Sequence, residues 1–545
     1  MSILRSIARR AMLPALGALI LAPTLAACSA SDPATSSAAT SVSDAPKDGG
    51  TLNIGLNAAL TCLDPHQNAS NVTIYVSRNI ADSLTDQDPG TGDLKPWLAE
   101  KWEVNDDATA ITFHLRPGIT FTDGTPLDSA AVKANFDSIK QLGNAKAFLA
   151  NSYLSDYDTT EVVDATTFVV HFSKPNIQFL QGTSTVTLGI FSAANVAKSA
   201  DERCAGDLVG SGPFSITSYK PDTEIDLAKN PAYDWPSELR THTGAAHLDA
   251  VDFKVVTENG VRSGQLSSGA LDLDTIPLTE DLDRFSGNGF SVVGRPYPGL
   301  VINLGVNLSR PLLQDVDVRR ALLVGIDRDS LVSNVLSKFD KPATGVLSSA
   351  TPFYSADDQI RYDPTQAESL LDAAGWVKGS DGIRSKDGQR LSLFLYFATF
   401  RQSAQVAQVL QQQLKAIGVE LKVQEATPAQ AAEYSANGDY DFSYSYFIRA
   451  DPDVLKANFS TEYSNASHAQ PDEKLDGLLD LQATQSAPAA RQKTVDEAQK
   501  ILLDQVYLIP LFEFAQLVTK SDAVHDFTLD GTSRLNLYDT WLDRA

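Results

Sequence analysis

The alternation of hydrophobic and polar residues predicts strands and helices along most of the chain. Residues 111–121 alternate around Pro117-Gly118, which indicates a strand, a turn and a second strand. A helix should follow, with Asp128 or Ser129 as its N-cap and with three apolar residues at i, i+4 and i+7 spacing on its buried face, Val132, Phe136 and Ile139. Sheet and helix are therefore combined early in the chain.

A second part of the chain predicts a strand, a helix and a strand in succession. Residues 391–397 form an apolar strand, residues 401–417 repeat apolar positions at helical spacing, and residues 419–423 alternate. Two strands joined by a helix are normally parallel with a right-handed crossover. A further helix over 489–504 leads into a strand over 506–514. The predicted fold class is α/β or mixed, with several sheets.

The first 28 residues have the three zones of a signal peptide. A basic start precedes an apolar stretch from Ala11 to Leu25, which is shorter than the roughly 20 apolar residues of a membrane-spanning helix. Leu25-Ala26-Ala27-Cys28 resembles the lipobox of bacterial lipoproteins. This resemblance implies cleavage after residue 27 and a lipidated Cys28 that anchors the chain on the outer face of the cell membrane. The alternative is an ordinary secretory signal with an incidental cysteine.

Residues 28–50 read as a disordered tether, because Ser, Ala, Thr, Asp, Pro and Gly leave almost nothing to bury. A flexible tether of about 20 residues spans roughly 25 Å. The folded body is expected to begin near Thr51, and no later segment is apolar for 18 residues. Its length predicts two to four domains, at about 100 to 200 residues each.

Charge and cysteine content narrow the possible partners and the compartment. A formal net charge of −24 argues against nucleic acid and against adsorption to anionic lipid. With Cys28 lipidated, Cys62 and Cys204 remain as a pair that can form a disulfide in an oxidising compartment. Two buried free thiols are the alternative, which fits less well because both cysteines stand in polar, turn-rich stretches.

The sequence lacks the common catalytic motifs. We find no G-x-x-x-x-G-K-[ST] loop, no H-E-x-x-H and no G-x-S-x-G elbow. His242 and His247 have only Asp249 nearby as a further ligand, so a surface loop is a better interpretation than a metal site. Carboxylate pairs such as Asp451 and Asp453 carry no weight in so acidic a chain. We predict a protein that is not an enzyme and has no cofactor or metal; a secreted hydrolase is the third-ranked hypothesis.

Several motifs from residue 94 to residue 511 occur in the order found in one family. They read LKPWLAEKWEV (94–104), ITFHLRPG (111–118), FTDGTPL (121–127), VGSGPF (209–214), DVRRAL (317–322), AQKILL (498–503) and LIPL (508–511). The series resembles extracellular solute-binding protein family 5, the dipeptide-, oligopeptide- and nickel-complex-binding receptors of ABC importers. Locally, their Pro-Gly and Asp-Gly pairs supply turn geometry.

The resemblance implies a large periplasmic-binding-protein-like α/β fold of three domains, whose two lobes close on a central ligand cleft. The expected boundaries are 51–80, 206–302 and 509–545 for a discontinuous domain I, 81–205 for domain II, and 303–508 for domain III. The implied function is a monomeric receptor that captures a peptide-like or anionic small solute and delivers it to ABC permease subunits. A surface lipoprotein that keeps the fold for signalling or adhesion is the alternative.

The resemblance places residues 440–453 in the ligand cleft. Receptors for free peptides carry an Asp just before the Asp-Pro element, where this chain has Ile448 and Arg449, and this departure argues against a free peptide amine. Arg449 can grip a carboxylate or phosphate through its planar fork, or it can form a salt bridge on the hinge side of the cleft.

Other candidate ligand contacts are aromatic or basic. Tyr444, Tyr446 and Phe447 can stack on a ligand or belong to the core. Arg401, between Phe400 and a helix, is a second candidate anion partner, since the helix N-terminus adds a favourable dipole. Weaker candidates are Leu60, Thr61 and Tyr297.

Overall fold

The computed structural model describes residues 45–544. The predicted signal peptide, the predicted lipidation site Cys28 and most of the expected tether lie outside these residues. The first strand, β1, begins at Thr51, where the folded body was expected to start. Within residues 45–544, no helix combines the length and the apolar character needed to cross a membrane.

A seven-stranded sheet forms the centre of the first lobe, which comprises residues 46–296 and 515–544. Its strand order is β12-β22-β11-β1-β10-β9-β8, and β1 runs parallel to β10 and β11 while the other pairs are antiparallel. The strands are β1 (Thr51–Leu56), β8 (Phe214–Lys220), β9 (Glu224–Lys229), β10 (Ala250–Val255), β11 (Leu273–Asp274), β12 (Phe290–Pro296) and β22 (Ala515–Ser521). Helices α1 (Asn71–Ser77) and α6 (Asn259–Ser267) also belong to this lobe.

A four-stranded antiparallel sheet and a long helix complete the first lobe. The sheet order is β4-β5-β7-β6, with β4 (Ala99–Val104), β5 (Ala110–Leu115), β6 (Tyr157–Val162) and β7 (Thr167–Phe172). Helix α2 (Ser129–Tyr153) begins as predicted, because the Asp128 side chain accepts from the Ala131 amide at 2.9 Å. Its predicted apolar face is buried, and the helix is interrupted at Gly143 and Ala147. Shorter elements are β2 (Thr85–Gln87), β3 (Leu94–Pro96), α3 (Phe179–Gly182), α4 (Ala193–Val196) and α5 (Ala200–Cys204).

The predicted strand near residues 119–121 does not form. Only one isolated bridge, between Thr120 and Pro126, occurs there. The Phe121 amide donates to the Thr125 carbonyl at 2.9 Å, and the Asp123 side chain accepts from the Thr125 amide at the same distance. The Asp-Gly turn therefore closes the segment on itself before it can pair with a strand.

The second lobe, residues 299–513, is built on a six-stranded sheet of order β14-β21-β13-β20-β18-β19. The strands are β13 (Gly299–Val306), β14 (Lys341–Pro342), β18 (Ser392–Phe397), β19 (Glu420–Glu425), β20 (Phe442–Ile448) and β21 (Leu508–Glu513). The helices are α7 (Val316–Val324), α8 (Arg328–Val335), α9 (Pro364–Ala373), α10 (Ser403–Ala416), α11 (Pro428–Asn437), α12 (Val454–Phe459), α13 (Glu473–Gln482) and α14 (Pro488–Asp504). A small sheet holds β15 (Val377–Lys378), β16 (Arg384–Lys386) and β17 (Gln389–Arg390). Strand β18 precedes α10 in the sequence and β19 follows it, and the two strands pair in parallel. This arrangement confirms the predicted strand–helix–strand unit.

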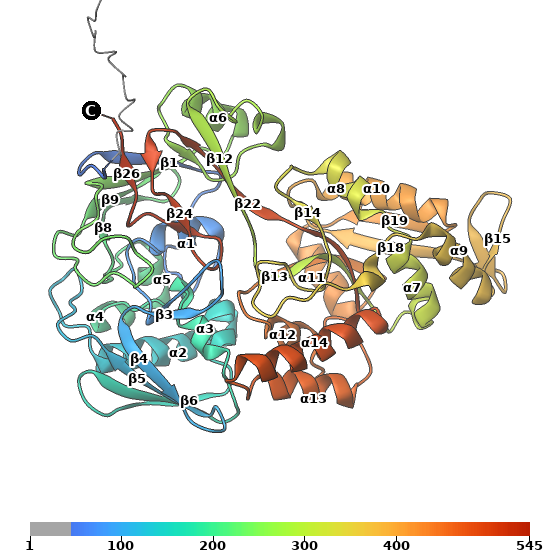
Figure 1. The fold of residues 1–545 in the computed structure, drawn as a ribbon, viewed down its shortest axis with the longest axis horizontal. Helices are drawn as coiled ribbons and strands as arrows, with labels where there is room; N and C mark the ends of the chain where they lie inside the picture. The colour runs from blue at the N-terminus through green and yellow to red at the C-terminus, as the bar shows by residue number, and fades with distance from the viewer. Residues whose placement is uncertain (1–44, 545) are drawn as a thin grey trace, which may run out of the picture. The chain divides into compact units, whose positions relative to one another are not determined.

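The chain passes between the two lobes at two adjacent places. Strands β12 and β22 lie side by side in the first lobe, and β13 and β21 pair in the second (Figure 1). The Tyr297 amide donates to the Phe514 carbonyl at 3.0 Å where the two connections meet. The chain thus leaves the sheet of the first lobe at 297–298 and returns to it after 514. The expected domain boundaries were 302 and 508, which would leave the start of β13 and nearly all of β21 in domain I.

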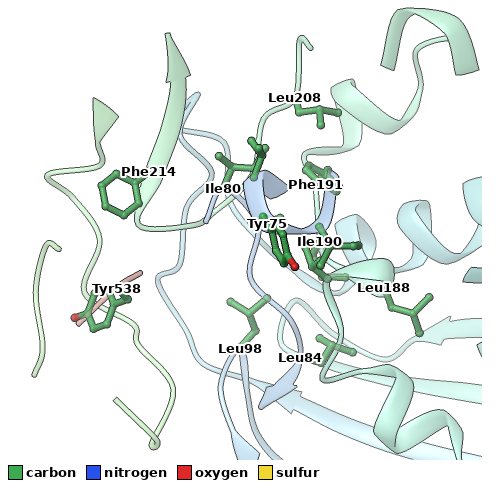
Figure 2. Close-up of a cluster of buried hydrophobic side chains, with 14 of the residues drawn as sticks. Tyr75, Ile80, Leu84, Leu98, Leu188, Ile190, Phe191, Leu208, Phe214 and Tyr538 are labelled. Atoms are coloured by element: carbon green, nitrogen blue, oxygen red, sulfur yellow. The ribbon is translucent and has the colours of Figure 1, made fainter. Parts of the chain in front are cut away.

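The end of the chain returns to the first lobe. Its strands are β23 (Val524–His525), β24 (Thr528–Leu529), β25 (Leu535–Asn536) and β26 (Trp541–Leu542). Figure 1 labels β24 and β26 among the red segments. Tyr538 from this segment joins a buried cluster with side chains from the early part of the chain (Figure 2). The labelled members include Tyr75, Phe191 and Phe214. The expected disulfide between Cys62 and Cys204 is present in this lobe.

Candidate functional site

Three cavities lie between the two lobes, and residues 447–450, at the end of β20 and just past it, contribute to each of them. The α2 cavity, of about 550 Å³, is lined by α2 and by Phe447 and Arg449. The loop cavity, of about 300 Å³, is lined by residues 87–92 and by Ala450. The small cavity, of about 40 Å³, is closed on the second-lobe side by Ile448. Because successive side chains of a strand point to opposite faces, this one segment can serve different cavities. Of the stretch 440–453 that was predicted to enter the cleft, residues 447–450 and Asp453 line these cavities.

Four of the predicted site residues meet in one aromatic cluster beside the crossing connections. Phe400 stacks on Tyr446 with ring centroids 4.8 Å apart, and both rings pack against Phe514, at 5.5 and 5.1 Å. Tyr297 also packs against Phe514, with ring centroids 4.7 Å apart. The guanidinium of Arg401 lies 5.6 Å from the Phe514 ring. The predicted aromatic and basic residues are thus neighbours in space.

Arg401 also reaches the first lobe. Its Nη2 donates to the carbonyl of Ala515, 2.7 Å away, just past the second crossing. Burial raises the pKa of Tyr444, and the nearby charge of Arg401 acts in the opposite direction. The side chain of Arg401 remains exposed to solvent. Arg401 is therefore both a contact between the lobes and a cation open to a solute.

Gln516, which the sequence did not single out, organises two tyrosines at the same place. Its Oε1 accepts from the hydroxyl of Tyr75, 2.6 Å away, and from that of Tyr297. Its Nε2 donates to the carbonyls of Thr275 and Leu517, at 2.7 and 2.8 Å. The side-chain amide of Gln516 is buried, and its oxygen and its nitrogen each make two hydrogen bonds. It therefore holds the hydroxyls of Tyr75 and Tyr297 in place at the base of the cluster.

Arg449 forms a salt bridge, the second of its two predicted roles. Its side chain is 1 % exposed. Nη1 donates to Asp453 Oδ2 at 2.8 Å and Nη2 donates to Ser152 Oγ at 2.7 Å, while the guanidinium lies over the ring of Tyr153, 4.8 Å away. Burial raises the pKa of Asp453, and the charge of Arg449 opposes that rise. Arg449 thus joins the lobes, and its charge is already compensated.

The loop cavity and the small cavity are basic although the chain is acidic. Four cations line the small cavity and the loop cavity: Arg78, Arg295, Lys341 and Arg534. Arg401 adds a fifth at the aromatic cluster. Two carboxylates line the same two cavities, Asp88 and Asp530. The chain as a whole carries a formal charge of −24. Cations lining a cleft with low-dielectric walls attract anions into it.

The remaining candidates lie elsewhere. Leu60 is fully buried in the core of the first lobe, where its carbonyl accepts from the Tyr219 hydroxyl at 2.7 Å, and neither Leu60 nor Thr61 lines the three cavities. The rings of His242 and His247 stack with centroids 4.2 Å apart. Within residues 45–544, no three His, Cys, Asp or Glu side chains are arranged to hold a metal ion.

Comparison with known proteins agrees with this architecture. The model for bacterial extracellular solute-binding proteins, family 5 middle, matches residues 93–467. The chain belongs to this family. Among curated family 5 relatives, the probable D,D-dipeptide-binding periplasmic protein DdpA of Escherichia coli is 27% identical over 493 residues, covering 86% of this chain and 89% of its own. The glutathione-binding protein GsiB of Salmonella paratyphi A is 26% identical over 504 residues, covering 88% and 91%.

A solved structure shares the family 5 fold. NikA from Brucella suis, in complex with Fe(III)-EDTA, superposes with a TM-score of 0.80 at 22% identity. The match covers 91% of this chain and all of the NikA chain. The fold is therefore that of the large periplasmic binding proteins, as the sequence predicted.

Proposed function

We propose that this family 5 protein is the lipid-anchored receptor of an ABC importer and that it captures a small anionic, peptide-like solute between its lobes. The observation that carries the proposal is the charge of the loop cavity and the small cavity, which four cations and two carboxylates line in a chain of net charge −24. Two relatives support a peptide-like solute, since one is named for a D,D-dipeptide and another for glutathione. Both of those solutes carry carboxylates.

The geometry supports capture by closure of the lobes. Arg401 and Ser152 each make a hydrogen bond that joins the lobes, the first at the aromatic cluster and the second beside the α2 cavity. A solute that contacts both lobes stabilises the closed state, because it binds that state better than the open one. The permease can then distinguish a loaded receptor from an empty one without any covalent step.

Native mass spectrometry of the purified protein tests the solute class. We expect a bound small molecule with at least one carboxylate, and adding it back at 100 times its Kd should stabilise the protein by about 2.7 kcal/mol in a thermal unfolding assay. Arg401→Gln should weaken binding, whereas Arg390→Gln, an exposed arginine paired with Asp381 and Glu420 outside the cleft, should not. Turnover of the bound molecule, or a cationic solute, would contradict the proposal.

The lipid anchor has its own test. Cys28→Ser should move the protein from the membrane fraction to the soluble or secreted fraction without changing solute affinity, because residue 28 lies before the folded body. Loss of uptake of the solute in a deletion strain, restored by the wild-type gene, separates a transport receptor from a surface lipoprotein used in signalling or adhesion. Unchanged uptake would favour the latter.

A further inference from the structure

The small cavity lies at the interface of the lobes and has the size of one chemical group. Buried side chains of the first lobe line it, among them Arg78, Tyr153, Asp530 and Arg534, and Ile448 closes it from the second lobe. Its volume is about 40 Å³. One water molecule occupies roughly 10–15 Å³ of cavity volume measured in this way, so the cavity has room for about three heavy atoms. A carboxylate has three.

The one carboxylate of this cavity is already engaged. Oδ1 of Asp530 accepts from the amide and the hydroxyl of Thr532, at 2.8 and 2.7 Å, and from the Arg534 amide at 2.9 Å. Oδ2 lies 3.6 Å from Nε of Arg78. Asp530 therefore shapes the turn between β24 and β25 and compensates the charge of Arg78.

Arg534 has no such compensation. Its side chain is 7 % exposed, and its Nη1 donates to the carbonyl of Thr532 at 3.2 Å. Its guanidinium lies over the Tyr297 ring, 4.9 Å from the centroid. Within residues 45–544, no carboxylate oxygen lies within 4.0 Å of the guanidinium nitrogens of Arg534. A guanidinium carries five N–H donors, and a buried charge without a partner is unfavourable, so an anion in the cavity would satisfy both needs.

We propose that the small cavity binds a carboxylate of the transported solute and that Arg534 is its anchor; this inference rests on the proposed receptor function. Arg78 and Arg534 outnumber the single carboxylate of this cavity, Asp530, and Ile448 adds no acceptor. The cavity therefore selects a negatively charged end of the solute over a free amine. Arg401 lies open at the aromatic cluster for a second anionic group. The solute class is then a peptide-like molecule with a carboxylate at each end.

Matched probes test which end group the cavity accepts. Peptides of one, two and three alanines are each capped with a succinyl, a butyryl or a β-alanyl group, so that the acyl chain ends in a carboxylate, a methyl or an ammonium. Affinities are measured by calorimetry with the intact protein. At least one succinyl peptide should bind roughly tenfold more tightly than its butyryl and β-alanyl partners, because charge-assisted hydrogen bonds to the guanidinium are strong.

Variants assign this preference to Arg534. Arg534→Gln should abolish the succinyl preference, Arg534→Lys should keep part of it, and the distant Arg390→Gln should leave it unchanged. Ile448→Asp places a competing carboxylate against the cavity and should also abolish the succinyl preference. This second variant tests the inference if Arg534→Gln does not fold. A preference for the β-alanyl series, or a succinyl preference that survives both Arg534→Gln and Ile448→Asp, overturns the inference and leaves the receptor function standing. Failure of all three series to bind, with no solute bound to the purified protein, overturns both.

Discussion

The guanidinium of Arg449, just past β20, donates a hydrogen bond to the hydroxyl of Ser152 near the end of α2, 2.7 Å away. This bond joins the two lobes, while Asp453 compensates the charge within the second lobe. Hydrogen bonds to charged groups contribute about 1.5–3 kcal/mol. The contact exists only when the lobes are together, so it stabilises the closed state relative to the open one.

Ser152→Ala should therefore lower the affinity for the solute by roughly tenfold or more, because closure loses one charge-assisted hydrogen bond. Calorimetric titration with the solute identified by mass spectrometry measures the change. The matched control is Ser155→Ala: Ser155 lines the same cavity, but its hydroxyl donates to the carbonyl of Ser152 within its own segment. Equal losses in the two variants would contradict a role for the Arg449 contact in closure.

Gln516→Leu should strongly destabilise the protein. The substitution leaves the hydroxyls of Tyr75 and Tyr297 and the carbonyl of Thr275 without their partner. Each buried polar group left unsatisfied costs about 1–3 kcal/mol, so the free energy of unfolding in urea should fall by several kcal/mol. Gln424→Leu makes the same change at an exposed position and should have little effect. A small loss at residue 516 would show that water replaces the amide.

Two buried groups should make opposite contributions to the pH dependence of the free energy of unfolding. Burial lowers the pKa of His66 to about 4 and raises the pKa of Asp82 to about 7. Nδ1 of His66 accepts from Arg203 at 2.8 Å, so protonation there would break this contact. Between pH 4 and 6.5, His66 is protonated in the unfolded chain and neutral in the folded protein. Over the same range, Asp82 is protonated in the folded protein and ionised in the unfolded chain. The two slopes of stability against pH are opposite in sign and cancel.

Single variants should reveal each slope. In Asp82→Asn the His66 contribution remains, so the free energy of unfolding should rise by about 3 kcal/mol as pH increases from 4 to 6.5. In His66→Gln the Asp82 contribution remains, so it should fall by about 4 kcal/mol as pH increases from 4 to 7. Denaturant unfolding across this range measures both. Parallel profiles for wild type and both variants would disprove the assignment.

Removal of the disulfide should destabilise the first lobe. Cys62 and Cys204 are 142 residues apart, and closing so long a loop in the unfolded chain is worth about 4–5 kcal/mol in the chain-entropy model. The double variant Cys62→Ser/Cys204→Ser should lose stability of this order in urea. A reducing agent should shift wild type toward the variant and leave the variant unchanged. Equal stability of the two proteins would contradict the expectation.

Elements whose pattern is local could be predicted from the sequence. The cap at Asp128 and the strand–helix–strand unit over 391–423 depend on residues close in sequence, and both are present. The role of Arg449 could not be decided, because its partner Ser152 lies 297 residues earlier. Arg534 and Gln516 stand in stretches where no periodicity points to a site. Their importance arises from contacts that the completed fold creates.

The return of the chain end to the first lobe affects how the protein is made. Strand β22, the neighbour of β11 and β12, begins at Ala515, and the Leu537 amide donates to the side chain of Asn79, 458 residues earlier. A chain synthesised from its N-terminus cannot complete this lobe until those late residues have emerged from the ribosome. Contacts of such long sequence separation also form slowly. The nascent polypeptide therefore stays incompletely folded during most of its elongation, which is the state a translocation channel can thread.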